Sequence, residues 1–341
     1  MNLKFQKTCH LFHWLSYLSF SRIVNFVRFL FAYSFTFLGL NRTVKLSPFF
    51  ISVEPADFCN LQCPECPVGL KNSISTERKG NFFDLELYRN LIEELKETLL
   101  HVQFYFQGEP FLNNQLTEMI HFAHERKLFT SVSTNGQFLT EKTARNVVQS
   151  GLDKLIVSVD GTTQEVYEMY RKGGNLQKVF DGINKVSVWK KQLKSFTPMI
   201  EIQFLVLKSN EHQMGEMKQI AKMMKVDKLS FKSAQFCDFE NGNSQIPENS
   251  RYARYRLTEC GKFELKFSQP NRCSRLLGGA VINTRGEVLP CCYDKKSEYS
   301  FGNIRMATFH ACWHSDKANS FRKQLLLNRS QFDICRNCTG K

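Results

Sequence analysis

The feature that most constrains the fold of this 341-residue chain is a regular alternation of strand-like and helix-like segments that begins near residue 48. Short apolar runs, typical of buried strands, alternate with stretches in which apolar residues recur every three or four positions. The expected strands are residues 49–55, 102–108, 129–136, 154–161, 199–207 and 228–234, and the expected helices are 84–99, 116–127, 139–151, 177–193 and 211–225. This alternation predicts a mostly parallel sheet with helical crossovers. Six such units predict an α/β fold that is an incomplete, (β/α)6 version of the eight-unit barrel.

The alternation covers only the middle of the chain and suggests three regions. Residues 1–47 are basic and hydrophobic and are expected to form a helical extension. Residues 48–257 contain the six βα units. Residues 258–341 lack the strand–helix alternation, are rich in turns and contain cysteines. We therefore expect a core domain over 48–257 and a small second domain over 258–341.

Polar motifs follow four of the expected strands. A cysteine-rich stretch follows the first strand, "QGEP" (107–110) ends the second, "STNG" (133–136) ends the third and "SVDG" (158–161) ends the fourth. In barrels of this type the functional groups lie at the carboxyl ends of the strands. We therefore expect these four motifs to surround one mouth.

The stretch "FCNLQCPECP" places Cys59, Cys63 and Cys66 within eight residues. Thiolates at this spacing can hold an iron–sulfur cluster from one loop, whereas a structural zinc ion takes four protein ligands. No fourth ligand is near, because the next cysteine is Cys237 and the next histidine is His101. The spacing therefore indicates a metal centre with one open position, and three incidental buried cysteines are the alternative.

These motifs resemble those of the radical SAM superfamily. The cysteines match its Cys-x3-Cys-x2-Cys motif, and "QGEP" resembles its GGEP motif, with Gln107 in place of the usual first glycine. The resemblance implies a TIM-type core in which the three cysteines bind three irons of a [4Fe-4S] cluster. It also implies that the amino and carboxylate groups of S-adenosylmethionine (SAM) chelate the fourth iron.

The resemblance further implies a set of SAM-binding residues at the strand ends and just beyond: Gln107, Gly108, Glu109, Ser133, Asn135, Ser158, Asp160 and Arg171. Residues 107–109 would accept hydrogen bonds from the SAM amino group, and Ser133 and Asn135 would bind the ribose hydroxyls. Asp160 either contacts the cofactor or builds a turn with Gly161. Arg171 either pairs with the SAM carboxylate, for which an arginine fork is suited, or forms a surface salt bridge.

The second domain carries its own cysteine pattern, Cys273, Cys291, Cys335 and Cys338. This spacing resembles the SPASM or shortened "twitch" extension of radical SAM enzymes, which binds an auxiliary [4Fe-4S] cluster. Cys291 is favoured over the adjacent Cys292 as the ligand, because the Gly-x4-Cys spacing counts from Gly286. A zinc ribbon is the alternative interpretation of the four cysteines. The other cysteines (Cys9, Cys237, Cys260 and Cys312) have no partner at ligand spacing and are expected to be small buried hydrophobic residues, as is Trp313.

The N-terminal segment and the net charge of +14 suggest an anionic partner. The first 53 residues contain no Asp or Glu, and their longest runs without Lys or Arg, 8–21 and 29–41, are too short for a membrane span. Residues 1–47 either lie on an anionic membrane surface or pack as a helical extension. With no cleavable signal peptide and with metal-type cysteine spacing, we expect a cytoplasmic protein, either free or at the inner face of the membrane.

The expected function is a radical SAM oxidoreductase of the maturase type. It would cleave SAM to a 5′-deoxyadenosyl radical, abstract a hydrogen atom from a peptide, protein, carbohydrate or alcohol, and use the auxiliary cluster as electron acceptor. A reductant such as flavodoxin or ferredoxin is an expected partner. No residue is assigned as catalytic; Asp238, Glu240 and Tyr252 are candidate bases by location only. The alternatives are an RNA-modifying radical SAM enzyme, for which no RNA-binding module is evident, and a non-catalytic iron–sulfur or zinc scaffold.

Overall fold

The structure, a computed structural model, describes residues 13–37, 46–70, 80–267 and 269–338. The chain divides into two compact units that do not follow its order. The first unit contains residues 1–57, 80–131 and 269–341, and the second contains 58–79 and 132–268. The domain boundaries expected near residues 47 and 257 stay a prediction.

The strands of the first unit combine the beginning of the chain with its end. They are β1 (Phe50–Val53), β2 (His101–Phe104), β9 (Gly279–Ile282), β10 (Glu287–Leu289) and β11 (Gly302–Asn303). β1 pairs in parallel with β2 on one side and with β9 on the other. β10 then pairs antiparallel with both β9 and β11. The cysteine-bearing C-terminal segment therefore extends the sheet that the first βα unit begins, which the sequence did not reveal.

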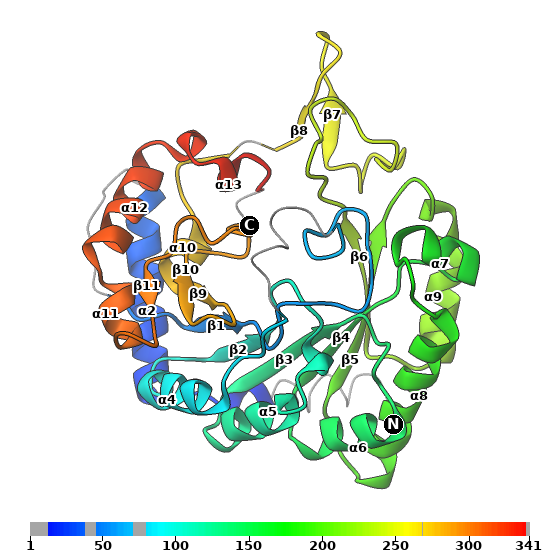
Figure 1. Ribbon diagram of the computed structural model, residues 1–341, viewed down its shortest axis with the longest axis horizontal. Coiled ribbons are helices and arrows are strands. Elements are labelled where there is room, and N and C mark those ends of the chain that lie inside the picture. The colour runs from blue at the N-terminus through cyan, green and yellow to red at the C-terminus, as the bar shows by residue number, and fades with distance from the viewer. Residues whose placement is uncertain (1–12, 38–45, 71–79, 268, 339–341) are drawn as a thin grey trace. The chain divides into compact units, whose positions relative to one another are not determined.

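Helices cover the outer side of these strands in the first unit (Figure 1). Those on the outer side are α2 (Phe20–Phe37), α4 (Leu85–Leu95), α5 (Leu116–Glu125), α11 (Phe309–Trp313) and α12 (Asp316–Leu327). The unit also contains α10 (Ser274–Gly278) and α13 (Asp333–Arg336), with 3-10 turns η1 (Pro110–Leu112) and η3 (Arg329–Gln331). Asp84 caps α4 by accepting a hydrogen bond from the backbone N–H of Leu87. α12 corrects the expectation of a turn-rich C-terminal region, since its buried residues Ala318, Phe321 and Leu325 recur at helical spacing.

The second unit holds the later βα units. β3 (Phe129–Thr134) leads the chain into it, and β4 (Lys154–Ser158), β5 (Met199–Val206) and β6 (Lys228–Ser233) pair in parallel. One side of these strands is lined by helices (Figure 1), namely α6 (Glu141–Gln149), α7 (Gln164–Tyr170), α8 (Leu176–Gln192) and α9 (Met214–Met223), the last preceded by the turn η2 (Glu211–Gln213). The expected ends of α6 are confirmed: Thr140 caps it by accepting from the N–H of Thr143, and Gly151 has a positive φ of 78°. The short α7 was not expected.

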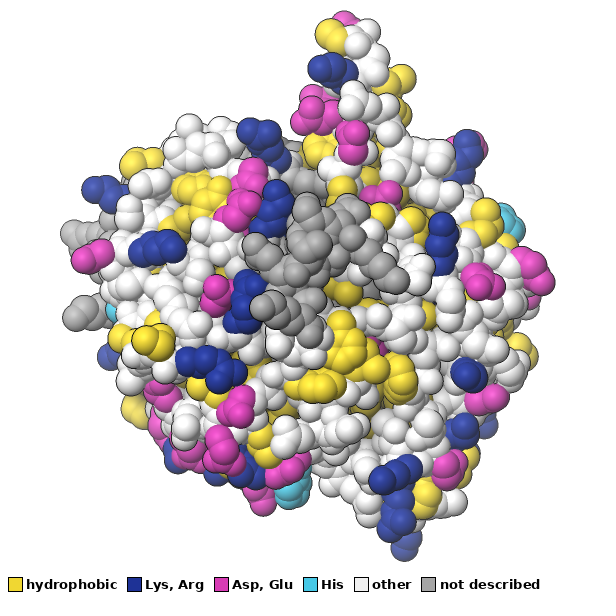
Figure 2. Space-filling model, in the orientation of Figure 1, with side chains coloured by type: hydrophobic (Ala, Val, Ile, Leu, Met, Phe, Trp, Pro, Cys, Tyr) yellow, Lys and Arg dark blue, Asp and Glu magenta, His cyan; other side chains and the backbone are white. Residues whose placement is uncertain are grey.

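A two-stranded antiparallel hairpin completes the second unit. It consists of β7 (Tyr255–Leu257) and β8 (Phe263–Leu265), and it projects from the rest of that unit (Figure 1). Acidic and basic side chains lie along it in Figure 2. Its two strands are joined by the ion pair Arg256–Glu264 at 2.7 Å. The position at which the sequence suggested a domain boundary, residue 257, lies at the start of the hairpin turn.

The architecture is the expected mostly parallel α/β fold with helical crossovers. Among the described residues no strand pairing closes the sheet into a complete barrel, in keeping with six rather than eight βα units. No helix in the described part of the chain is long and apolar enough to cross a membrane.

Candidate functional site

The three motif cysteines are presented by one short loop of the second unit. The Cys63 side chain is buried, Cys59 and Cys66 are half-buried, and all three are reduced. The loop is held by its own backbone, because Cys66 N–H donates to the Cys63 carbonyl at 3.2 Å and Leu70 N–H donates to the Cys66 carbonyl at 2.9 Å. Three soft ligands are therefore held on one tightly folded segment.

Gly69 makes this tight fold possible. A Cβ atom at position 69 would lie 2.5 Å from the Cys63 carbonyl oxygen and 2.6 Å from the Cys63 nitrogen. Real Cβ atoms do not approach backbone atoms so closely, so no other residue fits without moving Cys63. Nothing in the sequence singled out this glycine; its position three residues beyond Cys66 was the only available signal.

The end of β3 fixes the loop from a second side. Asn135 is buried, and its amide nitrogen donates to the Asn60 Oδ1 at 2.8 Å and lies 3.6 Å from the Cys59 sulfur. Its Oδ1 accepts from the N–H of Gln137 at 3.0 Å. Ser133 lies half-buried near the end of β3. The structure thus places Asn135 beside the cysteine loop, and its assignment to the SAM ribose stays a prediction.

Asp160 and Arg171 form a buried ion pair next to Cys63. The Arg171 Nε lies 2.5 Å from the Asp160 Oδ2, and its Nη1 lies 3.9 Å from the Cys63 sulfur. The other oxygen of Asp160 accepts from the N–H of Leu205 at 2.7 Å. Burial opposes the charged guanidinium, but Asp160 and Cys63 together raise the pKa of Arg171 well above its ordinary value. The alternative of a surface salt bridge for Arg171 is therefore wrong, because Asp160 is completely buried.

The buried pair also acts on the Cys63 thiol. Burial raises the pKa of Cys63, and the neighbouring Arg171 opposes that shift. A thiol in this setting needs a positive partner to ionise, and a bound metal supplies one. Ser158, the last residue of β4, is buried two residues before Asp160.

Glu65, between the second and third motif cysteines, connects the loop to the segment after β6. Its carboxylate accepts from the Cys237 N–H at 3.2 Å and from the Asn243 side chain at 2.9 Å. Sequence reasoning missed this residue, although an acid inside a cluster-binding motif was a usable signal. The connected segment carries the candidate bases Asp238 and Glu240, both exposed, while Tyr252 is half-buried.

The "QGEP" motif lies in the first unit, just after β2. The Gln107 amide nitrogen donates to the Lys295 carbonyl at 3.0 Å, and its Oε1 is buried without a hydrogen-bond partner in the described chain. Gly108 is buried. Glu109 is 2% exposed and accepts from the N–H of Phe111 at 3.1 Å. The side chain that replaces the usual glycine therefore ties the motif to the loop that follows Cys291.

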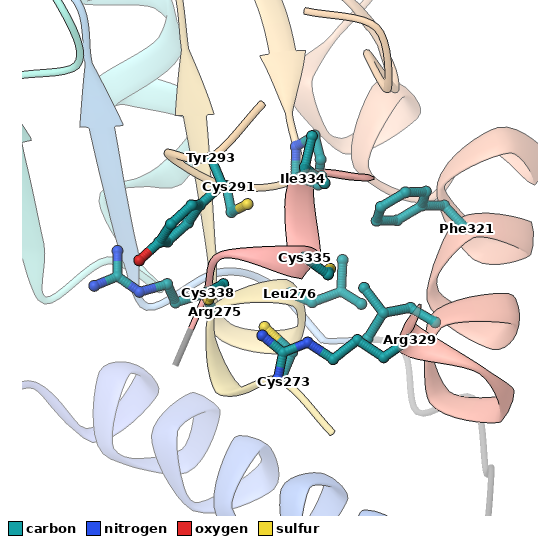
Figure 3. A pocket seen from close by; sticks show the side chains of 12 residues that line it. Cys273, Arg275, Leu276, Cys291, Tyr293, Phe321, Arg329, Ile334, Cys335 and Cys338 are labelled. Carbon is teal, nitrogen blue, oxygen red and sulfur yellow. The ribbon is translucent and has the colours of Figure 1, made fainter. Parts of the chain in front are cut away.

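In the first unit, the four cysteines of the second pattern line one cavity (Figure 3). Cys273 precedes α10, Cys291 follows β10, Cys335 lies in α13 and Cys338 follows it. Their surroundings leave about 340 Å³ of atom-free space, part of it open to solvent. Cys291, and not Cys292, lines this cavity. Cys292 instead accepts from the Arg275 Nη1 at 3.2 Å.

The electrostatics of this cavity disfavour bare thiolates. Burial raises the pKa of Cys273, raises that of Cys291 well above its ordinary value, and raises that of Cys335 to about 11. Because neighbouring thiolates also repel one another, four ionised cysteines require a bound cation. The donor set of four thiolates around a cavity fits an iron–sulfur cluster, which is ligated by cysteine thiolates.

Two arginines also line the cavity, Arg275 and Arg329 (Figure 3). Arg329 is 1% exposed, and its Nε has no hydrogen-bond partner within the described residues. Burial opposes its charge, but Cys338 and Cys335 raise its pKa. Sequence reasoning missed both arginines; Arg275, two residues after Cys273, was the more detectable of them.

No group of three or more His, Cys, Asp or Glu side chains in the described ranges converges on a position for one metal ion. The four cysteines line one cavity, and four thiolates are the donor set of a multi-iron cluster and also of a structural zinc ion.

The remaining cysteines divide into two groups. Cys312 is buried as expected, and Trp313 is a core residue whose indole N–H donates to the Leu46 carbonyl at 2.6 Å. Cys237 and Cys260 are exposed, so the expectation that they are buried was wrong. Both lie in loops of the second unit, where no core covers them. Cys9 lies outside the described residues.

In comparisons with known proteins, the two cysteine patterns fall in two different family models. The sequence matches the radical SAM superfamily model over residues 53–197 and the SPASM model, an iron–sulfur cluster-binding domain, over residues 273–339. A relative, the S-adenosyl-L-methionine-dependent 2-deoxy-scyllo-inosamine dehydrogenase of Niallia circulans, is 26% identical over 85% of this chain and 92% of its own. The PqqA peptide cyclase of Rhizobium meliloti is 23% identical over 87% of this chain and 80% of its own.

Solved structures share the fold. BtrN in complex with AdoMet and 2-DOIA matches with a TM-score of 0.51 and 24% identity, over 86% of this chain and 93% of that one. Streptococcus suis SuiB bound to the precursor peptide SuiA matches with a TM-score of 0.60 and 15% identity, over 86% of this chain and 72% of that one. These likenesses concern the fold alone.

Proposed function

Because the chain belongs to the radical SAM superfamily and carries a C-terminal SPASM domain, we propose that it oxidises an unreactive carbon of its substrate by two electrons. It is a radical SAM enzyme with a [4Fe-4S] cluster, SAM and an auxiliary iron–sulfur centre as cofactors. When bound, these groups supply a 5′-deoxyadenosyl radical and an acceptor for the electron left on the substrate. The contrast between a three-cysteine loop and a four-cysteine cavity supports this proposal most strongly.

The ligand assignments that we propose follow this contrast. Cys59, Cys63 and Cys66 would hold the SAM-binding cluster and leave one iron open, and Cys273, Cys291, Cys335 and Cys338 would saturate the auxiliary one. In the SAM-binding half, Asn135 and Glu65 position the cysteine loop, and the Asp160–Arg171 pair presents a fixed positive charge beside Cys63. Glu109, Ser133 and Ser158 remain proposed contacts of SAM.

For the substrate we propose an alcohol carbon of a carbohydrate-like or aminocyclitol-like molecule. Similarity to the dehydrogenase over 92% of that relative supports this class. In this reaction a protein base must take the hydroxyl proton, and Asp238, Glu240 and Tyr252 remain the proposed candidates. A peptide is the second candidate substrate, supported by similarity to the peptide cyclases. The dehydrogenase and the peptide cyclases are all enzymes, which favours an enzyme over a scaffold.

The experiment that tests this function supplies candidate substrates to the anaerobically reconstituted, reduced protein. A flavodoxin or ferredoxin, the proposed physiological reductant, would deliver the electron. With substrate deuterated at the oxidised carbon, we expect deuterium in 5′-deoxyadenosine together with a carbonyl product. Oxidised alcohol without deuterium transfer would contradict hydrogen abstraction by the SAM-derived radical. Deuterium transfer from a peptide and not from alcohols would move the substrate to the second class.

Gly69→Ala is expected to remove the SAM-site cluster without unfolding the chain. The added methyl group would displace the Cys63 backbone, so the iron content should fall from about eight to about four per chain. Iron analysis and the visible absorption of the reconstituted protein measure this change. The matched control is Gly215→Ala in α9, where an added Cβ meets nothing within 4 Å and iron should stay unchanged. Full iron content in Gly69→Ala would contradict the tight loop.

Asp160→Ala is expected to lower the free energy of unfolding by about 3 kcal/mol, because it removes a fully buried carboxylate and leaves the half-buried Arg171 guanidinium without its ion-pair partner. Urea denaturation followed by circular dichroism measures the loss. The exposed Asp238 provides the control, since Asp238→Ala should change the midpoint little. Equal midpoints for the two variants would show that the Asp160–Arg171 pair is not structural.

A further inference from the structure

Helix α2 turns an apolar face toward solvent. Its exposed large hydrophobic residues are Phe20, Ile23, Val27, Leu30 and Phe31. Their spacing of three and four residues places them on one side of the helix, which we call the outer face of α2. Phe20 is 83% exposed and Phe31 is 65% exposed, and Trp14 and Leu15 are also exposed just before the helix. An apolar patch of this kind on a folded protein usually marks an interaction site.

The opposite side of α2 carries its buried polar residues and attaches the helix to the first unit. Arg22 is buried and donates to the carbonyl of Lys96 at 2.7 and 3.0 Å and to that of Arg126 at 2.8 Å. Asn25, also buried, donates to the Thr98 carbonyl at 3.2 Å. Polar residues normally face water on a surface helix. Here they bind the protein, and the outward side is apolar instead.

Packing on the inner side holds this orientation. Phe29 is buried and its ring lies 4.7 Å from that of Phe49, centroid to centroid, while Phe26 meets the same ring edge-on at 5.1 Å. Within the first unit α2 packs against α10. The contacts that hold α2 among the described residues lie on its inner side, so within the described part of the chain the outer face is available to a partner.

The positive charge of the N-terminal segment favours an anionic partner. The first 53 residues contain no Asp or Glu, and of their six basic residues Lys4, Lys7, Arg42 and Lys45 lie outside the described residues, while Arg22 is bound on the inner side of α2. Arg28 is exposed, one helical step from the apolar stripe. We propose that the outer face of α2 rests on an anionic lipid surface, with its apolar side chains in the headgroup region and Arg28 on a lipid phosphate. This inference is independent of the proposed reaction.

A second copy of the chain fits this face less well. An isologous dimer through the outer face would bring together two segments that are basic and contain no Asp or Glu of their own. A lipid surface supplies both an apolar layer and negative charge. The helix would lie in the plane of the membrane, since no helix in the described ranges is able to span one.

The test is flotation of the full-length, cluster-loaded protein with lipid vesicles. We expect binding to vesicles of phosphatidylglycerol and phosphatidylcholine, with much weaker binding to phosphatidylcholine alone. The triple variant Ile23→Ser, Leu30→Ser and Phe31→Ser should bind at least about tenfold more weakly, because three apolar side chains lose their burial. Arg28→Gln should weaken binding to the anionic vesicles about fivefold.

The control is Met223→Ser with Met306→Ser, since these methionines are 72% and 87% exposed and lie off α2. This variant should bind like the unmodified protein. Unchanged circular dichroism and iron content verify that each variant is folded. Equal binding to both vesicle types, or full binding by the triple serine variant, would overturn the proposal. A dimer that the triple serine variant converts to a monomer, without vesicle binding, would assign the face to a second copy instead.

Discussion

Replacing Cys59, Cys63 and Cys66 together by alanine is expected to abolish reductive cleavage of SAM while about four irons per chain remain. The three thiols come from one loop of the second unit, and the four auxiliary cysteines line a cavity of the first unit. Loss of one ligand set therefore leaves the other intact. The measurement is 5′-deoxyadenosine formed from SAM and reductant, together with iron content, after anaerobic reconstitution.

The control for this variant is Cys260→Ala, which removes an exposed cysteine that belongs to neither pattern. It should retain about eight irons and normal 5′-deoxyadenosine formation. Cleavage of SAM by the triple alanine variant at the rate of the unmodified protein would place the reactive cluster elsewhere. Loss of all iron from that variant would show that the two cysteine sets do not act separately.

The second large effect concerns the adjacent Cys291 and Cys292. Cys291→Ala should lose the auxiliary cluster, about four irons, because Cys291 lines the cavity with Cys273, Cys335 and Cys338. Cys292 does not line the cavity and accepts a hydrogen bond from Arg275, so Cys292→Ala should keep the full iron content. Cys291→Ala should still cleave SAM but form no oxidised product, since no acceptor for the substrate electron remains.

Iron content and product formation distinguish the possible ligand sets. If Cys292→Ala loses the auxiliary iron and Cys291→Ala keeps it, the assignment of the ligand is reversed. If neither loses iron, the four-cysteine cavity is not the auxiliary site. Oxidised product from Cys291→Ala at the normal rate would contradict the proposed role of the auxiliary cluster as electron acceptor.

Local sequence chemistry predicted those parts of the fold that depend on neighbouring residues. The ends of α6 followed from Thr140 as a cap and Gly151 as a stop, and the strand–helix alternation predicted all six parallel strands from β1 to β6. The pairing of β9 with β1 joins residues more than two hundred positions apart, and no local pattern encodes it. The same limit explains why the pairing of the C-terminal strands with β1 was not predicted.

At the candidate site, the expected cluster ligands were predicted from the sequence, whereas the residues that hold them in place were not. The cysteines were predicted, because thiolate spacing within a loop is visible in the sequence. The buried pair between Asp160 and Arg171 was not, since each residue had a plausible role alone and only the folded chain brings them together. Gly69 and Arg329 were missed for a related reason: their importance comes from a close backbone approach and from burial, neither of which leaves a motif.

The most direct measurement is the electron paramagnetic resonance spectrum of a variant that keeps only the SAM-site cluster. Cys335→Ala with Cys338→Ala removes two cavity ligands and leaves Cys59, Cys63 and Cys66 untouched. After reduction, one cluster signal is expected, and added SAM should change its g values because the amino and carboxylate groups bind the open iron. A signal identical with and without SAM would contradict an open, reactive cluster on this loop.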